Sequence, residues 1–249
     1  MNIILLGHDD IASKIALRSI VRQLPGHSYR LFLSGPLRAG SDHLPEPLHD
    51  LLRLDRRFFE SISWDIGCEP DDLPDPNSTN GVATLRDCSP DLFVSIRYRR
   101  ILKSAAIEIP RYGVLNLHSG LLPEYKGVMA TFWAMLNGEA KIGCTSHQIV
   151  DAGIDTGPII GLSESPPRYD WSYLANVLEL YPAGCGMIVD AVNTIVAGRP
   201  ITTSLQSGKG HYYSTPASED LDRFAAQGFR LADAGDLDNF LSRHGGTLS

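Results

Sequence analysis

Apolar and polar positions alternate in blocks over the first 34 residues. An apolar run over 1–7 is followed by a segment over 11–24 with apolar side chains at helical spacing, and then by a second apolar run over 29–34. Pro25 and Gly26 stand between the helical segment and the second run, where a helix is expected to end. A strand, an amphipathic helix and a second strand form a β-α-β unit, which predicts a parallel sheet.

Blocks of the same kind continue to residue 196. The run over 91–96 is apolar at nearly every position and follows Pro90, which is typical of a central strand buried on both faces. Pro182 interrupts the last helical pattern, so we expect one helix kinked at that point or two consecutive helices. The pattern predicts helices over 48–62, 101–107, 129–136 and 169–196, strands over 91–96, 113–118, 144–150 and 158–164, and loops over 36–47 and 69–81.

Beyond Pro200 the pattern weakens. It offers a strand candidate over 201–205, a turn-rich stretch over 208–216 and two weak helices near 218–227 and 235–243. A segment of about 50 residues is too short to bury a core of its own. We therefore divide the chain into a domain over 1–199 and a small C-terminal appendage over 200–249. Tyr212, Tyr213 and Phe224 have no evident core within the appendage, which makes it a candidate contact in a homodimer.

Composition narrows the class of protein. The 249 residues carry a net charge of −7, with 43% apolar and 20% charged residues, which excludes a disordered chain and a disulfide-stapled mini-protein. No apolar stretch reaches 18 residues, and the start of the chain lacks the basic region of a signal peptide. We therefore expect a cytoplasmic protein without membrane contact, and the acidic balance disfavours nucleic acid as a partner.

The spacing of the cysteines and histidines does not predict a metal site. The four cysteines and eight histidines form no pair at metal-ligand spacing, so we expect reduced thiols and no metal site.

The candidate chemistry lies between residues 113 and 160. Asn116 and His118 are two residues apart on a predicted strand, so their side chains point to the same face. Asp155 follows in a turn-rich loop between two predicted strands. Asn116 can donate to a developing oxyanion, His118 can carry a proton, and Asp155 can orient His118 and accept a proton from an attacking amine. No G-x-S-x-G motif is present, which disfavours a serine hydrolase.

Two segments resemble the folate-dependent formyltransferase family. They are N-L-H-S-G-L-L-P-E-Y-K-G over 116–127 and D-A-G-I-D-T-G-P over 151–158. The resemblance implies a Rossmann-like α/β fold, in which helices flank a mostly parallel sheet, and 10-formyltetrahydrofolate as co-substrate. It also implies a catalytic set of Asn116, His118 and Asp155, and cofactor-binding walls that contain Arg100, Ile101, Leu102 and Asp151.

Departures from the family pattern reduce the number of acceptor substrates to be considered. The glycinamide ribonucleotide enzyme has a Gly- and Ser-rich phosphate loop where this chain has G-H-D-D-I over 7–11. The methionyl-tRNA enzyme has a larger C-terminal domain and basic surfaces. We therefore expect the amine of a small molecule, either an amino-sugar nucleotide or an amino acid such as hydroxyornithine. Asp9, Asp10 and the acidic loop over 69–75 are candidate contacts for a cationic acceptor, and Arg97 or Arg99 for the phosphates of a sugar nucleotide.

Two alternatives remain open. One is a hydrolase that releases formate from the same donor, although formyltetrahydrofolate hydrolases add an N-terminal regulatory domain and the catalytic pattern starts here at residue 1. The other is a folate-binding protein without catalysis, against which the complete Asn-His-Asp set argues.

Overall fold

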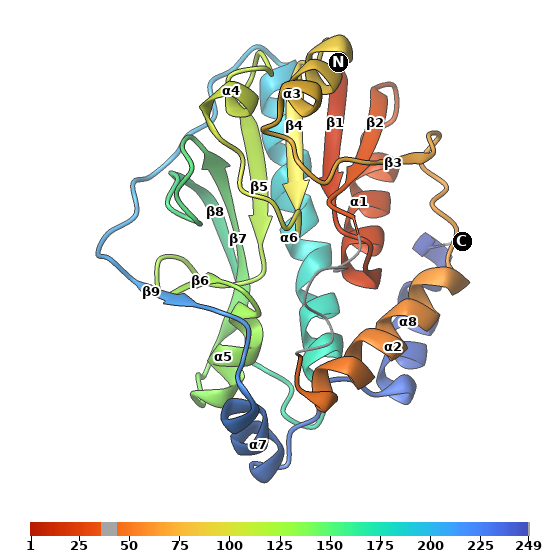
Figure 1. Ribbon diagram of the computed structural model, residues 1–249, viewed down its shortest axis with the longest axis vertical. Helices are drawn as coiled ribbons and strands as arrows, with labels where there is room; N and C mark the ends of the chain where they lie inside the picture. Colours follow the sequence, from red (N-terminus) through yellow and green to blue (C-terminus); the bar gives the residue numbers. More distant parts are fainter. Residues whose placement is uncertain (36–43, 249) are drawn as a thin grey trace.

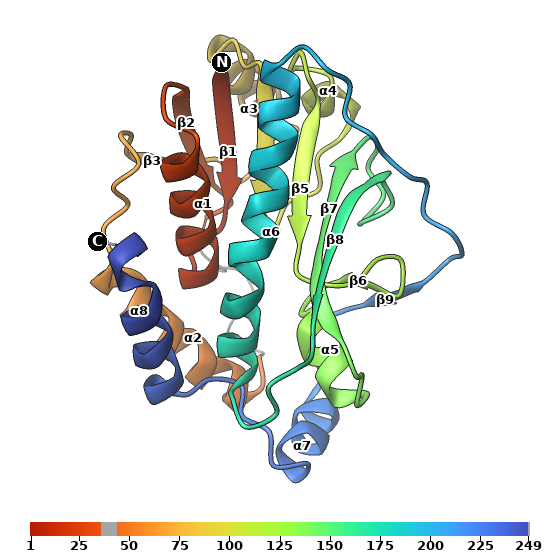
Figure 2. The same ribbon diagram turned by 180° about the vertical axis from the view of Figure 1, so that it is seen from behind.

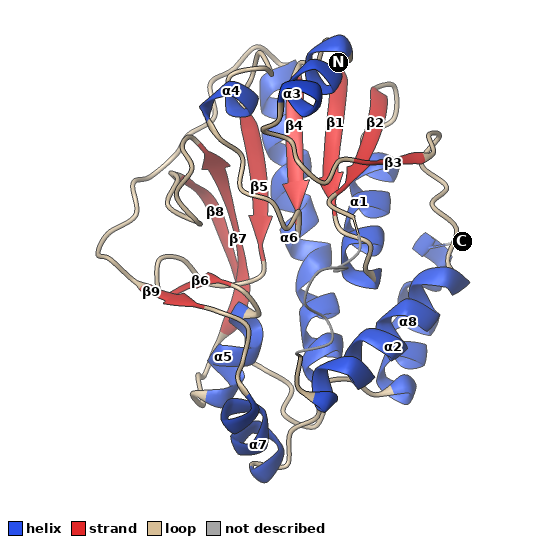
Figure 3. Ribbon diagram, in the orientation of Figure 1, coloured by secondary structure: helices blue, strands red, loops and turns tan. Residues whose placement is uncertain are grey.

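A seven-stranded sheet forms the centre of the protein (Figures 1 and 3). The computed structural model describes residues 1–35 and 44–248, so most of the predicted loop over 36–47 lies outside the described residues. The strand order is β3-β2-β1-β4-β5-β7-β8, in which the first five strands are parallel and β7 and β8 are antiparallel. The strands are β1 (Asn2–Gly7), β2 (Ser28–Leu33), β3 (Pro70–Asp72), β4 (Leu92–Ile96), β5 (Val114–His118), β7 (Ile142–Ile149) and β8 (Ile159–Ser165).

Helices cover both faces of this sheet. Figure 2 shows α1 and α6 side by side on one face, and Figure 1 shows α3 and α4 on the other. The predicted mostly parallel α/β fold is therefore confirmed. The helices are α1 (Ile11–Gln23), α2 (Glu46–Ser61), α3 (Thr79–Asp87), α4 (Ser104–Ile107), α5 (Ala130–Leu136), α6 (Tyr173–Val196), α7 (Ser218–Ala226) and α8 (Ala234–Leu248).

Alternate residues of each strand enter different cores. Ile3 and Leu5 of β1 belong to the large core on the α1 and α6 side, whereas Ile4 and Leu6 belong to a smaller core on the α3 and α4 side. Both faces of β1 are buried, so polar and apolar residues do not alternate along the strand. This explains why the central strands are nearly continuous apolar runs.

Three sequence predictions need correction. The predicted loop over 69–81 contains β3 and the start of α3, whose N-cap Ser78 accepts a hydrogen bond from the Gly81 N–H. The helix predicted over 169–196 starts at Tyr173 and is one helix that includes Pro182. The expected strand over 201–205 is reduced to a single bridge between Ser204 and Ile159.

The C-terminal residues pack onto the sheet domain. β9 (His211–Tyr213) pairs with β6 (Tyr125–Gly127), and Phe224 stacks on Phe132 with ring centroids 4.5 Å apart. Tyr213 stacks on Trp133, so of the three aromatic residues that suggested a dimer contact only Tyr212 is exposed. In the part of the chain that the structure describes, no helix is long and apolar enough to cross a membrane.

The carboxyl ends of the parallel strands define where a ligand can bind. β1, β4 and β5 run in the same direction and end at the same edge of the sheet. The chain continues from β1 to β2 and β3 in one direction and from β4 to β5 in the other, so the strand order reverses between β1 and β4. Crevices at such reversals are the usual ligand sites of open α/β sheets.

Candidate active site

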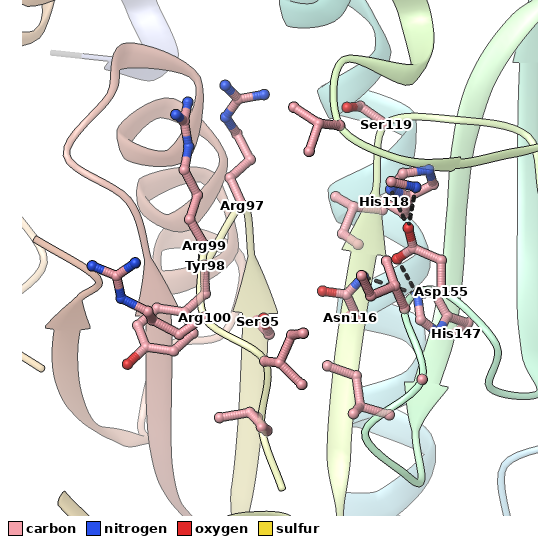
Figure 4. Close-up of a pocket in the computed structure, with 18 of the residues that line it drawn as sticks. Ser95, Arg97, Tyr98, Arg99, Arg100, Asn116, His118, Ser119, His147 and Asp155 are labelled. Atoms are coloured by element: carbon pink, nitrogen blue, oxygen red, sulfur yellow. Dashed lines mark hydrogen bonds and ion pairs between the residues drawn. The ribbon is translucent and has the colours of Figure 1, made fainter. Parts of the chain in front are cut away.

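A cavity of about 400 Å³ lies at the carboxyl ends of β4 and β5 (Figure 4). The loop after β4 forms one side, and β5, β7 and the loop between β7 and β8 form the other. The structure brings all seven predicted site residues to this cavity. They are Arg100, Ile101, Leu102, Asn116, His118, Asp151 and Asp155.

His147 holds Asn116 and was absent from the sequence prediction. The antiparallel pairing of β5 and β7 places the two residues directly opposite each other, so their side chains meet on one face. The Nδ1 of His147 lies 3.1 Å from the Gln148 carbonyl oxygen, and its Nε2 lies 2.9 Å from Asn116 Nδ2. The second N–H of the Asn116 amide remains for a ligand.

His118 lies between two oxygen acceptors. Its Nε2 is 2.7 Å from the Tyr125 carbonyl, and its Nδ1 is 3.5 Å from Asp155 Oδ2. Only the imidazolium form can donate toward both oxygens. The site therefore places an imidazole that can give or take a proton beside an anionic carboxylate.

Asp155 is fixed by three groups from three parts of the chain. The Gly127 N–H donates to its Oδ2 at 2.8 Å, and His147 Nε2 lies 3.5 Å from its Oδ1, opposite His118. Burial alone would raise the pKa of Asp155, but the two imidazoles and the Gly127 N–H outweigh burial and lower it to about 2. Asp155 is therefore a carboxylate that is ionised at neutral pH, with a side chain that is 12% exposed.

The loop that carries Asp155 is held from both sides. Asp151 accepts from the Gly153 N–H at 2.7 Å and from Thr156 Oγ1 at 3.1 Å, which makes its carboxylate part of the loop itself. From the C-terminal segment, Gln206 Nε2 donates to the carbonyls of Asp155 and Gly157 at 2.7 and 2.8 Å. Nothing in the sequence marked Gln206, because its partners are backbone groups about 50 residues away.

Side chains also support the loop that contains Arg100, Ile101 and Leu102. Asn77 donates to the carbonyl of Ile101 at 2.8 Å and accepts from the Lys103 N–H at 2.8 Å. Among the described residues, the backbone groups of Arg100 and Leu102 make no hydrogen bond of their own. The loop thus offers polar backbone groups at the wall of the cavity.

Three residues around the cavity have backbone angles that side chains rarely adopt. Arg97, Met129 and Asp155 have φ values of 59°, 55° and 53°, in the left-handed region. Each costs on the order of 1–2 kcal/mol relative to ordinary backbone. Such residues persist where the surroundings fix them, and they are concentrated at functional sites.

Asp9 and Asp10, considered above as contacts for a cation, already have partners. Asp9 Oδ2 is 2.7 Å from Arg56, and Asp10 Oδ2 is 2.8 Å from Arg97 and 3.4 Å from Arg99. The acidic loop over 69–75 does not line this cavity. Within the described residues, no group of three or more His, Cys, Asp or Glu side chains could hold a metal ion.

Sequence comparison places the central part of the chain among formyl transferases. The formyl transferase family model matches residues 76–166. Methionyl-tRNA formyltransferase of Deinococcus radiodurans is 37% identical over 127 residues, which cover 49% of this chain and 40% of that protein. The enzyme of the same name from Thermodesulfovibrio yellowstonii is 32% identical over 145 residues, 58% and 46% of the two chains. Each match covers less than half of the relative's own length.

Solved structures share the fold at low identity. A sugar N-formyltransferase from Shewanella sp FDAARGOS_354 has a TM-score of 0.61 at 16% identity, over 90% of this chain and 86% of that one. Glycinamide ribonucleotide transformylase 1 from Symbiobacterium toebii has a TM-score of 0.60 at 20% identity, over 83% and 94%. A sugar 3N-formyl transferase, solved in the presence of dTDP and 5-N-formyl-THF, has a TM-score of 0.58 at 21% identity, over 86% and 69%. The resemblance found in the sequence is thus confirmed: residues 76–166 match the formyl transferase family, and the chain has the fold of these solved formyltransferases.

Proposed function

We propose that this chain transfers the formyl group of 10-formyltetrahydrofolate to the amine of a small acceptor. One observation carries the proposal. An ionised Asp155 is held between His118 and His147, beside an Asn116 amide with one N–H to offer, at the carboxyl ends of β4 and β5. The match of residues 76–166 to the formyl transferase family supports the reaction type.

The chemistry assigns one task to each of these side chains. The acceptor nitrogen forms a bond to the formyl carbon while the bond from that carbon to N10 of the donor breaks. Asn116 and the His118 imidazolium stabilise the negative charge that develops on the formyl oxygen. Asp155 takes the proton from the attacking amine. The amine loses one proton and N10 gains one, so no further reactant is needed.

Two walls of the cavity suit the donor. The unpaired backbone groups of Arg100 and Leu102 can pair with the polar edge of a pterin, and the loop over 151–155 forms the opposite wall. The sugar 3N-formyl transferase of similar fold was solved in the presence of 5-N-formyl-THF, a related folate. The walls, the family and that neighbour together support a folate co-substrate for this chain.

The test is a pooled-acceptor assay read by mass spectrometry. The purified protein meets 10-formyltetrahydrofolate with amino-sugar nucleotides, hydroxyornithine, other amino acids, glycinamide ribonucleotide and methionyl-tRNA. A single acceptor that gains a formyl group identifies the reaction. Formate without a formylated acceptor favours the hydrolase, and folate binding without turnover favours a binding protein.

Substitutions test the catalytic set. Asn116→Ala and Asp155→Asn should each lower turnover by about 100-fold or more, because each removes an oxyanion donor or a proton acceptor, while folate binding is kept. Asn193→Ala and Asp87→Asn, at exposed helix positions, are the matched controls. Near-full turnover in either site variant would show that the assignment is wrong.

A further inference from the structure

A second cavity of about 210 Å³ adjoins the first at the point where the strand order reverses. Asp10, which follows β1, and the loop after β4 form its floor, and α2 forms one wall. The two cavities share the lining residues Arg97, Arg99, Val128, Met129 and Thr215. A ligand can therefore extend from the Asn116 and His118 side into the second cavity past the two arginines.

The two arginines carry more positive charge than their protein partner neutralises. Arg97 Nε donates to both oxygens of Asp10, at 2.8 and 3.1 Å, whereas Arg99 reaches the same carboxylate only at 3.4 Å. The other N–H groups of Arg99 have no hydrogen-bond acceptor among the described residues. Figure 4 shows both guanidinium groups across the cavity from Asn116 and His118.

A nearby carboxyl group cancels this charge only in part. Asp55 is buried in the second cavity and accepts from the Ile11 N–H at 3.0 Å. Burial and the adjacent Asp10 raise the pKa of Asp55 to about 7, against the Ile11 N–H and the two arginines. When Asp55 is protonated, two guanidinium groups face one carboxylate, which leaves one positive charge.

The usual anion site of such folds is closed in this chain. The N-terminus of α1 presents free N–H groups to which an anion commonly binds. Here Asp10 is the N-cap of α1 and accepts from the Ser13 N–H at 2.8 Å. An anionic ligand at this edge is therefore left with the two arginines.

The wall formed by α2 is apolar. Leu48, Leu51 and Leu52 line the cavity and are three and four residues apart, which places them on one face of the helix. Leu174 of α6 lines the same cavity. An apolar group of a ligand would lose contact with water against this wall.

We propose that the acceptor is a small amine that also carries an anionic group and an apolar side group, with the anion on Arg97 and Arg99 and the apolar group against Leu48, Leu51 and Leu52. An α-amino acid with an aliphatic side chain, or the corresponding phosphonate, has this chemistry. The inference rests on the proposed formyl transfer for the role of the amine, but the anion and apolar contacts do not depend on it.

Three matched probes test the anionic group. L-leucine, its phosphonate analogue and the decarboxylated 3-methylbutan-1-amine share the amine and the apolar group and differ only in the anion. We expect calorimetry to show that at least one anionic probe binds 10-fold or more tightly than 3-methylbutan-1-amine. The stronger of the two anionic probes identifies the source of the anion as carboxylate or phosphate.

Variants test the residues. Arg99→Gln should remove the preference for the anionic probes, whereas Arg53→Gln, an exposed arginine on α2, should keep it. Leu51→Ala should weaken the binding of L-leucine several-fold and leave the binding of L-serine unchanged. Leu54→Ala is the control on the same helix. Circular dichroism shows whether each variant is folded.

Two sets of outcomes overturn the inference. One is equal binding of 3-methylbutan-1-amine and both anionic probes, or binding of neither anionic probe. The other is an unchanged preference in folded Arg99→Gln, or a dTDP-linked amino sugar as the preferred acceptor. If the preferred acceptor were an amine without an anionic group, the inference about the acceptor would be wrong and the proposed formyl transfer would stand. If an anionic probe bound tightly but no amine were formylated, the inference about binding would stand and the proposed formyl transfer would be wrong.

Discussion

The position of His118 depends on a neighbour that has no side chain. A Cβ atom at Gly120 would lie 2.6 Å from His118 Nε2 and 2.7 Å from the Tyr125 carbonyl oxygen, so it would enter the hydrogen bond that joins them. We therefore expect Gly120→Ala to displace the imidazole and to lower kcat by about 10-fold or more, because small misplacements of a catalytic group are costly. The dissociation constant for folate, measured in parallel, should change little.

Gly186→Ala is the control for this substitution. Gly186 lies inside α6, and a Cβ atom there would meet no other atom within 4 Å. The change should keep kcat and raise the free energy of unfolding by roughly 0.5–1 kcal/mol, because alanine loses less backbone entropy in a helix. If Gly120→Ala retained the kcat of this control, the His118 to Tyr125 hydrogen bond would have no role in turnover.

At this scale the sequence predicted the catalytic side chains but not their partners. Strand alternation places Asn116 and His118 on one face, and the motif supplies Asp155. His147 and the Gly127 N–H were missed, because each depends on the register of elements that periodicity cannot align. The sequence contained His147 on a predicted strand, without a sign of which residue it would face.

Among the elements, length and burial decided what could be predicted. The long apolar and amphipathic blocks were found, whereas β3, β6 and β9 have three residues each, too few to show a period of two. Pro182 does not end α6, since the buried Tyr181 and Cys185 beside it anchor the helix in the core. Tertiary packing thus outweighs the hydrogen bond that proline cannot make.

The segment that crosses beside β8 holds the loop of Asp155, which gives a prediction for Gln206. Its Nε2 is the only atom of the described residues shown donating to the carbonyls of both Asp155 and Gly157, and its Oε1 is buried without a partner. Gln206→Leu keeps the size and removes both hydrogen bonds. We expect kcat to fall about 10-fold with the KM of the donor nearly unchanged, measured by steady-state kinetics.

Gln227, which follows α7, provides the comparison. Gln227 donates to the Leu136 carbonyl at 3.4 Å, away from the cavity, so Gln227→Leu should keep kcat. Equal effects of the two substitutions, or a loss in Gln206→Leu that is confined to stability, would show that Gln206 does not position the catalytic loop.

For the whole molecule, the placement of the C-terminal residues and of the charged groups goes beyond what the sequence pattern predicts. Leu221, Phe224, Leu237 and Phe240 are buried in the same core as α1 and α6, so residues 200–248 contribute to the core of the sheet domain. The protein carries a net charge of −7, yet the loop after β4 brings positive charge to the mouth of both cavities. The sequence named Arg97 or Arg99 as contacts for phosphates, but the contribution of the C-terminal residues to the core could not be predicted, since it requires knowing which distant segments meet.

The buried Asp55 should make the stability of the whole protein depend on pH. Its pKa is about 7 in the folded protein and near 3.8 when the chain is unfolded, so between these values the folded state holds a proton that the unfolded state has lost. This contribution therefore decreases stability as pH rises from about 4 to 7. His8, which is buried nearby and whose pKa burial lowers to about 3, acts in the opposite direction below pH 6.5.

Asp55→Asn separates the two effects, because the amide oxygen can still accept from the Ile11 N–H but cannot ionise. The charged groups that face Asp55, namely Asp10, Arg97 and Arg99, are unchanged in the variant. We expect urea unfolding to show that the free energy of unfolding of the variant, relative to that of the wild type, rises by roughly 2 to 3 kcal/mol from pH 5 to pH 8. The wild type loses this stability over about two pH units below the pKa of Asp55, at ~1.4 kcal/mol per unit, and the variant does not. The exposed Asp87→Asn should show no such trend. A constant difference between Asp55→Asn and the wild type across this range would mean that Asp55 is ionised in the folded protein, and that Arg97 and Arg99 are already neutralised without a ligand.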